Sequence, residues 1–270
     1  MKIGIVGRGF VGSAVYGAFK DHCKIYVADP KMNTTIKDDI LPNNPKVIFV
    51  CVPTPYGNNG EIDSSIVESV LDELKDFGGL VVLKSTVIPS ITTKLKSKVK
   101  HFIYNPEFLT ESNAEHDFIN ARMHVFGGDA YDTHKLEAIY NEYSLCVPAQ
   151  KYHMRAEEAS YVKYGLNVFL AVKVLFLNQF KDTMGNNAVY ETVINAMIAD
   201  GRIGPSHNMV PGPDGKHGFG GACFTKDTAA FASFANGDFT LLNEAIRANN
   251  EIRAQYDLCD REKAQNVKYL

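Results

Sequence analysis

The residues best suited to chemistry in this chain lie in the run 218–227, which reads GFGGACFTKD. It places Cys223 on a glycine-built loop directly before an apolar helical segment, with Lys226 and Asp227 three and four residues further on. Glycines let a backbone approach a ligand and adopt positive φ, and the N-terminus of a helix favours a thiolate. The run therefore predicts a reactive cysteine. The alternative is a tight loop around a buried, inert thiol.

A glycine pattern typical of nucleotide binding follows the first extended segment. Gly7, Gly9 and Gly12 form G-x-G-x-x-G where a helical segment begins, which permits a tight turn and brings backbone N–H groups to a pyrophosphate. Asp29 ends the next extended segment, where a carboxylate binds ribose hydroxyls and repels a 2′-phosphate. The pair predicts NAD in preference to NADP. The alternative is a glycine turn that binds no nucleotide.

Polar residues on a long apolar helical segment form a third pattern. Lys163 and Asn167 are four residues apart, so both side chains project from one face of a helix. A lysine and an amide together can stabilise a developing oxyanion. A solvated helix face is the alternative for this pair, and Glu107 could similarly be only the cap of a following helix.

The elements that must position these residues fall into two groups. Extended segments alternate with helical ones in the first half, which predicts an α/β fold with a Rossmann-type, doubly wound parallel sheet. The predicted strands are 3–6, 23–28, 47–52, 80–84, 101–104, 123–127 and 146–152. The second half is all helical, with predicted helices 156–180, 188–200, 225–234 and 240–256. We expect an NAD-binding domain at 1–154 and a helical domain at 155–270.

Composition narrows the class of protein. The 270 residues carry a net charge of -3 with dispersed lysines and arginines, which favours neither a nucleic-acid nor a membrane-surface partner. We expect no membrane span and a cytoplasmic location. The five cysteines are scattered without a C-x-x-C pair, so we expect reduced thiols and no structural metal site.

Taken in order, these motifs closely resemble the UDP-glucose/GDP-mannose dehydrogenase family. The resemblance rests on eight motifs spread along the chain: 7–12, 29–30, 51–55, 84–87, 105–109, Lys163 with Asn167, 202–204 and 218–227. It implies oxidation of the C6 alcohol of a nucleotide sugar to a carboxylate with two NAD⁺. A UDP-sugar, UDP-glucose first, is expected, while an N-acetylhexosamine nucleotide and GDP-mannose stay open. Cys223 would hold the aldehyde as a thiohemiacetal and then as a thioester, which divides the oxidation into two hydride steps and a hydrolysis.

The resemblance also implies roles for individual residues. Its catalytic residues would be Cys223, Lys163, Asn167, Asp227, Glu107 and Thr86. Those that bind the cofactor would be Gly7, Gly9, Phe10, Val11, Gly12, Asp29, Pro53, Thr54, Ser85, Thr86, Glu111 and Lys226. Those that bind the substrate would be Glu107, Phe108, Leu109, Lys163, Asn167, Arg202, His207, Asn208, Phe219 and Gly220. Arg202 matches an arginine that reaches the neighbouring subunit's sugar nucleotide.

Two features of this chain depart from the family pattern. Family members continue into a third α/β domain over the nucleotide, whereas this sequence stops at Leu270. The turn-rich loop 205–217 is long and polar, and we expect it to supply nucleotide contacts; a disordered surface loop is the alternative.

The apolar helix 156–180 has too many apolar positions for one buried stripe, which predicts a homodimer through the helical domain.

Two other functions fit parts of the sequence. A 3-hydroxyacid dehydrogenase also pairs a Rossmann domain with helices and uses a lysine and an asparagine four residues apart, but it has no need of Cys223. A non-catalytic module that binds NAD or a nucleotide sugar has no need of a nucleophile beside Lys226 and Asp227. The cysteine run therefore favours the nucleotide-sugar dehydrogenase.

Overall fold

The chain forms two compact units. The computed structural model describes residues 1–57, 60–110, 113–264 and 266–269. The first unit comprises Met1–Thr54 and Asp63–Lys163, and the second comprises Pro55–Ile62 and Tyr164–Leu270. The predicted domain boundary between residues 154 and 155 stays a prediction.

A seven-stranded sheet in the order β2-β1-β3-β4-β5-β6-β7 forms the centre of the first unit. Its strands are β1 (Lys2–Val6), β2 (Lys24–Ala28), β3 (Val47–Val50), β4 (Leu80–Leu83), β5 (Phe102–Tyr104), β6 (Met123–Gly128) and β7 (Gln150–Met154). Neighbouring strands are parallel except β5 and β6, which run antiparallel. The carboxyl ends of β1 to β5 therefore meet at one edge, where ligands of such sheets bind.

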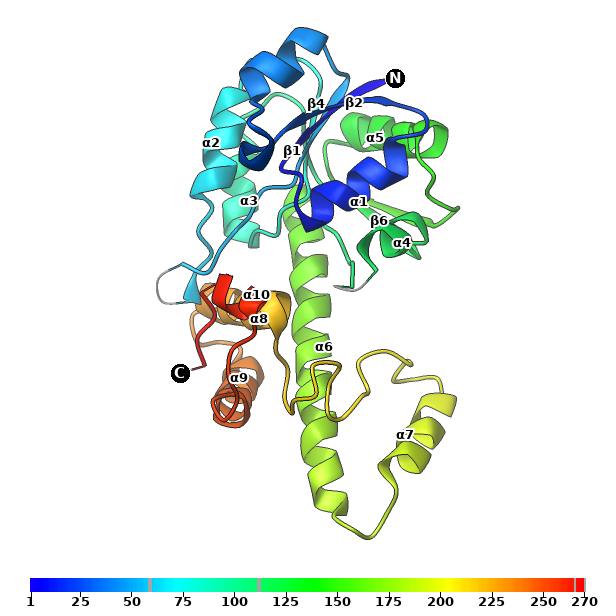
Figure 1. Cartoon of the computed structure of the whole chain (residues 1–270), viewed down its shortest axis with the longest axis vertical. Coiled ribbons are helices and arrows are strands. Elements are labelled where there is room, and N and C mark those ends of the chain that lie inside the picture. The colour runs from blue at the N-terminus through cyan, green and yellow to red at the C-terminus, as the bar shows by residue number, and fades with distance from the viewer. Residues whose placement is uncertain (58–59, 111–112, 265, 270) are drawn as a thin grey trace. The chain divides into compact units, whose positions relative to one another are not determined.

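Helices cover both faces of this sheet, so its short strands are apolar on both sides (Figure 1). The helices of this unit are α1 (Phe10–Phe19), α2 (Ser65–Glu73), α3 (Pro89–Leu95), α4 (Ala114–Ile119) and α5 (Ala130–Tyr143), with short turns at Pro30–Met32, Ile36–Ile40 and Leu41–Asn43. Val47 and Phe49 pack with α1, α4 and α5, whereas Ile48 and Val50 pack with α2 and α3. The predicted doubly wound sheet is confirmed, with one pair of strands reversed.

The second unit is helical. The long helix α6 (Ala156–Met184) begins in the first unit and continues into the second, followed by α7 (Tyr190–Ala199), α8 (Gly221–Phe234), α9 (Thr240–Arg253) and α10 (Asp260–Ala264). Ala171 and Leu175 of α6 pack with Phe219 and Ala245, while Leu177 packs with residues of α7. A loop of 21 residues, 200–220, connects α7 to α8.

Two sequence expectations about these helices need correction. Helix α8 begins at Gly221 and not at Thr225, so Cys223 lies inside its first turn and not on the loop before it. In addition, α6 contains an 18-residue window with a mean hydropathy of 1.4, long and apolar enough to cross a membrane, although we expected no such segment. Since 44% of that window is buried inside the protein, a core helix explains it equally well.

Candidate active site

The turn between β1 and α1 has the geometry of a phosphate-binding loop. Gly7 has φ +87°, and a Cβ there would lie 2.7 Å from the carbonyl oxygen of Cys51. A Cβ on Gly12 would lie 1.9 Å from the carbonyl oxygen of Gly7, so α1 packs too closely for any side chain. No described atom lies within 4 Å of the corresponding position on Gly9, the N-cap of α1. A phosphate could therefore approach the first N–H groups of α1.

Asp29 lies beside this loop at the carboxyl end of β2. Its Oδ2 accepts a hydrogen bond of 2.6 Å from the backbone N–H of Arg8, and its Oδ1 accepts one of 2.8 Å from Lys31. Each carboxylate oxygen has a second lone pair that a ribose hydroxyl can use. The loop and Asp29 together have the geometry to bind the adenosine end of NAD, and their role in binding stays a prediction.

The cofactor residues predicted after β3 and β4 meet at the same edge of the sheet. Ser85 is buried, and its hydroxyl donates a hydrogen bond of 2.7 Å to the carbonyl oxygen of Val52. Thr54 is buried, whereas Pro53 is exposed and Thr86 is partly exposed. Glu111, which we expected near the nicotinamide, lies outside the described residues.

A buried lysine of the 84–87 motif, to which sequence reasoning gave no role, lies at the same edge. Lys84 is 2% exposed, and its Nζ donates a hydrogen bond of 2.9 Å to Oδ1 of Asn105. The same oxygen accepts a hydrogen bond of 2.7 Å from the hydroxyl of Tyr140, and the Asn105 amide donates one of 2.8 Å to Val125. Burial lowers the pKa of Lys84 to about 8. The hydrogen bonds of Lys84 and Asn105 connect the ends of β4 and β5 to β6.

Lys163 and Glu107 form a buried ion pair in the first unit. The Nζ of Lys163 lies 3.1 Å from Oε1 of Glu107 and donates a hydrogen bond of 2.7 Å to its backbone carbonyl oxygen. Oε2 of Glu107 accepts a hydrogen bond of 2.7 Å from the N–H of Leu109, while the ammonium lies over the ring of Phe108. Lys163 is 3% exposed, which contradicts the alternative of a solvated helix face. The segment after β5 is therefore attached to α6.

The second unit holds a buried polar cluster around Asp227. Its Oδ2 accepts a hydrogen bond of 2.7 Å from the amide of Asn167, and its Oδ1 lies 2.7 Å from Nζ of Lys226. All three side chains are buried, with Asp227 1% exposed. Charges removed from water in this way are retained only when they are paired. The pairing connects α6 to the first two turns of α8.

Cys223 lies in the first turn of the same helix but faces solvent. It is an exposed thiol, which contradicts the alternative of a buried, inert cysteine. Gly218 and Gly221 have φ of +76° and +79°, a conformation that residues with side chains rarely adopt. Because Cys223 lies in the first turn of α8, the partial positive charge of the helix N-terminus favours its thiolate.

Residues predicted to contact the nucleotide are distributed along the 200–220 loop. Arg202 is exposed and pairs with Asp200. The ring of His207 lies 5.4 Å from that of Phe224, and the carbonyl oxygen of Asn208 accepts a hydrogen bond of 2.8 Å from Tyr190. Substrate contacts of these loop residues stay predictions, as do those of Phe219 and Gly220.

The loop itself is attached to α6 by two lysines that sequence reasoning missed. Lys173 donates hydrogen bonds of 2.8 Å and 3.1 Å to the carbonyl oxygens of Ile203 and Gly204, and Lys181 donates one of 2.6 Å to Val210. These contacts hold the backbone of the loop in place, contrary to the alternative of a disordered loop. The only sequence cue was their spacing of eight residues, which places them on one face of the helix.

Comparison with known proteins establishes the family. The NAD binding domain of the UDP-glucose/GDP-mannose dehydrogenase family matches residues 20–144, and the central domain of the same family matches residues 157–251. The chain belongs to the UDP-glucose/GDP-mannose dehydrogenase family. NAD is thus the cofactor of the first unit, in agreement with the glycine loop and Asp29, although the loop itself precedes the matched range.

Individual members of this family support the assignment. The UDP-glucose 6-dehydrogenase TuaD of Bacillus subtilis is 30% identical over 223 residues, which cover 77% of this chain and 47% of that protein. The GDP-mannose 6-dehydrogenase of Pseudomonas aeruginosa is 30% identical, with 88% of this chain and 58% of that protein covered. The structure of a UDP-glucose dehydrogenase from Pyrobaculum islandicum aligns with a TM-score of 0.76 and 26% identity, covering 93% of this chain and 68% of that one.

The family match has two limits along the chain. The chain spans about half the length of the UDP-glucose 6-dehydrogenases it matches, so the activity of the whole family enzyme is not thereby shown for it. The central-domain match ends at residue 251, so Arg253 and Glu262, which contact the loop before Cys223, lie outside it. Neither residue was singled out by sequence, because no recognised motif contains them.

Proposed function

We propose that this chain oxidises UDP-glucose to UDP-glucuronate with two NAD⁺ through a covalent intermediate on Cys223. The observation that carries the proposal is an exposed thiol in the first turn of α8, followed in the same helix by the buried Lys226–Asp227 pair. A simple alcohol dehydrogenase has no use for such a nucleophile. The proposal assigns NAD binding to residues 1–154 and the nucleophile to residues 155–270.

The residues of the chain would divide the reaction as follows. Bound NAD⁺ would accept a hydride in each of the two oxidation steps. Loss of the first hydride from C6 of the alcohol gives the aldehyde, and the Cys223 thiolate adds to this aldehyde to form a thiohemiacetal. Loss of the second hydride from C6 converts the thiohemiacetal to a thioester. Water then attacks the thioester, releasing the carboxylate and restoring the thiol. Lys163 and Asn167 would stabilise the oxyanions formed in these steps.

Proton transfer would fall to the acidic residues and Thr86. Asp227 is held by Asn167 and Lys226 and would position water and the departing proton, together with Thr86. Glu107 has its carboxylate fixed by Lys163 and by the N–H of Leu109, and it would assist thioester hydrolysis. Buried, hydrogen-bonded carboxylates keep the orientation that such proton transfers require.

The sugar nucleotide is the finer part of the proposal. UDP-glucose is favoured because curated relatives from Bacillus and Rickettsia that are 30% to 33% identical are UDP-glucose 6-dehydrogenases. The similar identity of the Pseudomonas GDP-mannose 6-dehydrogenase makes GDP-mannose the second candidate. Both sugars present a C6 alcohol to the same residues.

One assay tests the reaction and the substrate together. The purified chain is incubated with NAD⁺ and UDP-glucose, GDP-mannose or a UDP-N-acetylhexosamine, and NADH is counted per sugar consumed. We expect two NADH per UDP-glucose and no aldehyde that a hydroxylamine trap can capture. One NADH per sugar would exclude the four-electron reaction, and turnover of GDP-mannose alone would reassign the substrate. Cys223→Ser should abolish uronate formation, since an alkoxide forms far less readily than a thiolate at neutral pH.

We further propose that the chain acts as a cytoplasmic homodimer through its helical part. Leu166, Phe169 and Phe176 lie at helical spacing on α6 and are 37%, 63% and 56% exposed. An apolar row of this kind on a helix is typical of a subunit interface. Arg202, whose side chain is also exposed, would complete the sugar-nucleotide site of the neighbouring subunit.

A further inference from the structure

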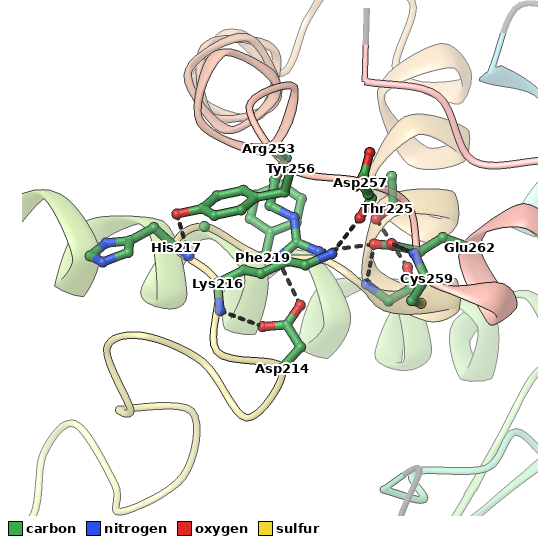
Figure 2. A network of polar contacts seen from close by, with 12 residues as sticks. Asp214, Lys216, His217, Phe219, Thr225, Arg253, Tyr256, Asp257, Cys259 and Glu262 are labelled. Atoms are coloured by element: carbon green, nitrogen blue, oxygen red, sulfur yellow. Dashed lines mark hydrogen bonds and ion pairs between the residues drawn. The ribbon is translucent and has the colours of Figure 1, made fainter.

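A buried network of charged residues lies behind the loop that precedes Cys223 (Figure 2). At its centre, Nη2 of Arg253 lies 3.0 Å from Oε1 of Glu262, and both side chains are 1% exposed. Nη1 of Arg253 lies 2.8 Å from Oδ2 of Asp214, and the hydroxyl of Tyr269 donates a hydrogen bond of 2.6 Å to Glu262. The network thus connects the end of α9, the segment 259–269 and the 200–220 loop.

The same network is packed against the backbone of the loop 218–221. A Cβ on Gly220 would lie 2.1 Å from Nη2 of Arg253, so only glycine allows the guanidinium to approach this closely. Asn249 accepts a hydrogen bond of 2.7 Å from the N–H of Phe219 and donates one of 3.0 Å to its carbonyl oxygen. The N–H of Gly218 is bound by Asn178 at 3.1 Å. The loop is therefore held by hydrogen bonds from α6 and α9, and Arg253 packs against Gly220.

Glu262 contacts the point where this loop becomes helix α8. Its Oε1 accepts a hydrogen bond of 3.0 Å from the N–H of Gly221, the first residue of α8, and its Oε2 accepts one of 2.8 Å from Cys259. Burial alone would raise its pKa, but hydrogen bonds from Tyr269, Cys259 and Gly221, with the charge of Arg253, lower it to about 2. Glu262 is therefore an ionised carboxylate at the helix end that carries Cys223.

We propose that Glu262, paired with Arg253, is a positioning residue that fixes the start of α8 and thereby the place and reactivity of the Cys223 thiol. The inference rests on the proposed role of Cys223 as nucleophile. A carboxylate bound to the Gly221 N–H fixes the first turn of α8, two residues before the thiol. Its negative charge also opposes the partial positive charge by which the helix N-terminus favours a thiolate. Glu262 would thus hold the loop in place and moderate the acidity of the thiol.

The test compares Glu262→Gln with Glu251→Gln, a matched control on the exposed face of α9. Both are made in a Cys259→Ser background, because Cys259 is the other exposed thiol. The rate of Cys223 alkylation by iodoacetamide is followed from pH 6 to 10 by peptide mass spectrometry. Loss of the carboxylate removes a negative charge bound to the first N–H of α8 and leaves Arg253 paired with Asp214, so the midpoint for Glu262→Gln should fall by roughly half a pH unit or more.

Turnover supplies a second measurement. If the loop is no longer held, NADH formation at saturating sugar should fall at least about tenfold, because small displacements of a reacting group are costly. The KM for NAD⁺ should stay unchanged, and Glu251→Gln should match the parent in every measurement. A role limited to stability would lower the melting temperature without moving the alkylation midpoint. An unmoved midpoint and full turnover in folded Glu262→Gln would overturn the proposal.

Two arrangements keep the test decisive. If Glu262→Gln does not fold, Tyr269→Phe is the substitute variant. It removes the hydrogen bond from Tyr269 to Glu262 and keeps the charges of Glu262 and Arg253, and it should accelerate hydrogen exchange in the peptide that contains residues 218–223. Unchanged exchange there would contradict the proposal. Alkylation needs no substrate, so it can be measured even if the parent protein forms no NADH. An inactive parent would refute the proposed oxidation, and a lower alkylation midpoint in Glu262→Gln would still support the positioning role.

Discussion

Asn167 donates a hydrogen bond of 2.7 Å to Asp227, a residue 60 positions further along the chain. The other oxygen of Asp227 lies 2.7 Å from the ammonium of Lys226, and all three side chains are buried. The carboxylate is therefore fixed in orientation and is the counter-charge of a buried lysine. Both properties lead to a test of its role.

Asp227→Asn should separate the structural from the chemical contribution of this carboxylate. The change leaves the buried Lys226 without a counter-charge, so the free energy of unfolding should fall by about 3 kcal/mol. NADH formation should fall about 100-fold. The double variant Lys226→Met with Asp227→Asn should regain most of the stability, measured by urea unfolding, but not the activity. A double variant as active as the parent would remove Asp227 from the reaction.

Asp29→Asn should weaken the preference for NAD⁺ over NADP⁺. A carboxylate repels a 2′-phosphate, and asparagine removes that repulsion while keeping one acceptor for the N–H of Arg8. The ratio of kcat/KM for NADP⁺ to that for NAD⁺ should rise by roughly tenfold or more. Asp21→Asn, at an exposed aspartate of the same unit, provides the control. An unchanged ratio would mean that Asp29 does not face the ribose.

Lys84→Met should stabilise the protein more at neutral than at alkaline pH. Burial lowers the pKa of Lys84 to about 8, whereas an unfolded lysine has a pKa of about 10.4. Below pH 8 the folded state bears the full cost of the buried charge, and this cost disappears as the pH rises from 8 to about 10.4. The stability advantage of Lys84→Met over the parent should therefore shrink by roughly 3 kcal/mol across that window.

Urea unfolding at a series of pH values measures this difference. Comparing the variant with its parent cancels most contributions from other groups. The charged and titratable groups near Lys84 include Cys51, Glu107, Cys146 and Lys163, together with His124 and Tyr140. Burial raises the pKa of Cys51 to about 12, so its thiol stays neutral in the folded state through the window. A stability difference that does not depend on pH would show that Lys84 keeps an ordinary pKa.

Mixing two inactive variants tests whether Arg202 acts between subunits. Arg202→Ala and Cys223→Ala should each be inactive alone. In a mixed dimer, one site combines an intact Cys223 with the neighbour's intact Arg202, so up to roughly half of the sites in each mixed dimer should be active. NADH formation after verified subunit exchange measures the recovery. If no activity returns, Arg202 acts within its own chain or not at all.

Much of the fold was predictable from local sequence. Short apolar strands alternating with helices predict a doubly wound sheet, and Gly7, Gly9 and Gly12 define the turn after its first strand, because these features depend on neighbouring residues. The start of α8 was predicted four residues too late. Glycine is a poor helix former, so nothing in the local sequence placed Gly221 inside the helix. Its N–H is bound by Glu262, 41 residues away.

The sequence by itself determined which side chains are available for chemistry, whereas the tertiary structure decided which of them are paired. The spacing of Lys163 and Asn167 placed both on one helix face, and by spacing alone a solvated face was the more common outcome. Only the fold brings Lys163 to Glu107 and Asn167 to Asp227, across 56 and 60 residues. Burial makes such partners necessary, because a charge removed from water is costly unless it is paired. Which partner each residue finds depends on long-range packing that no local pattern encodes.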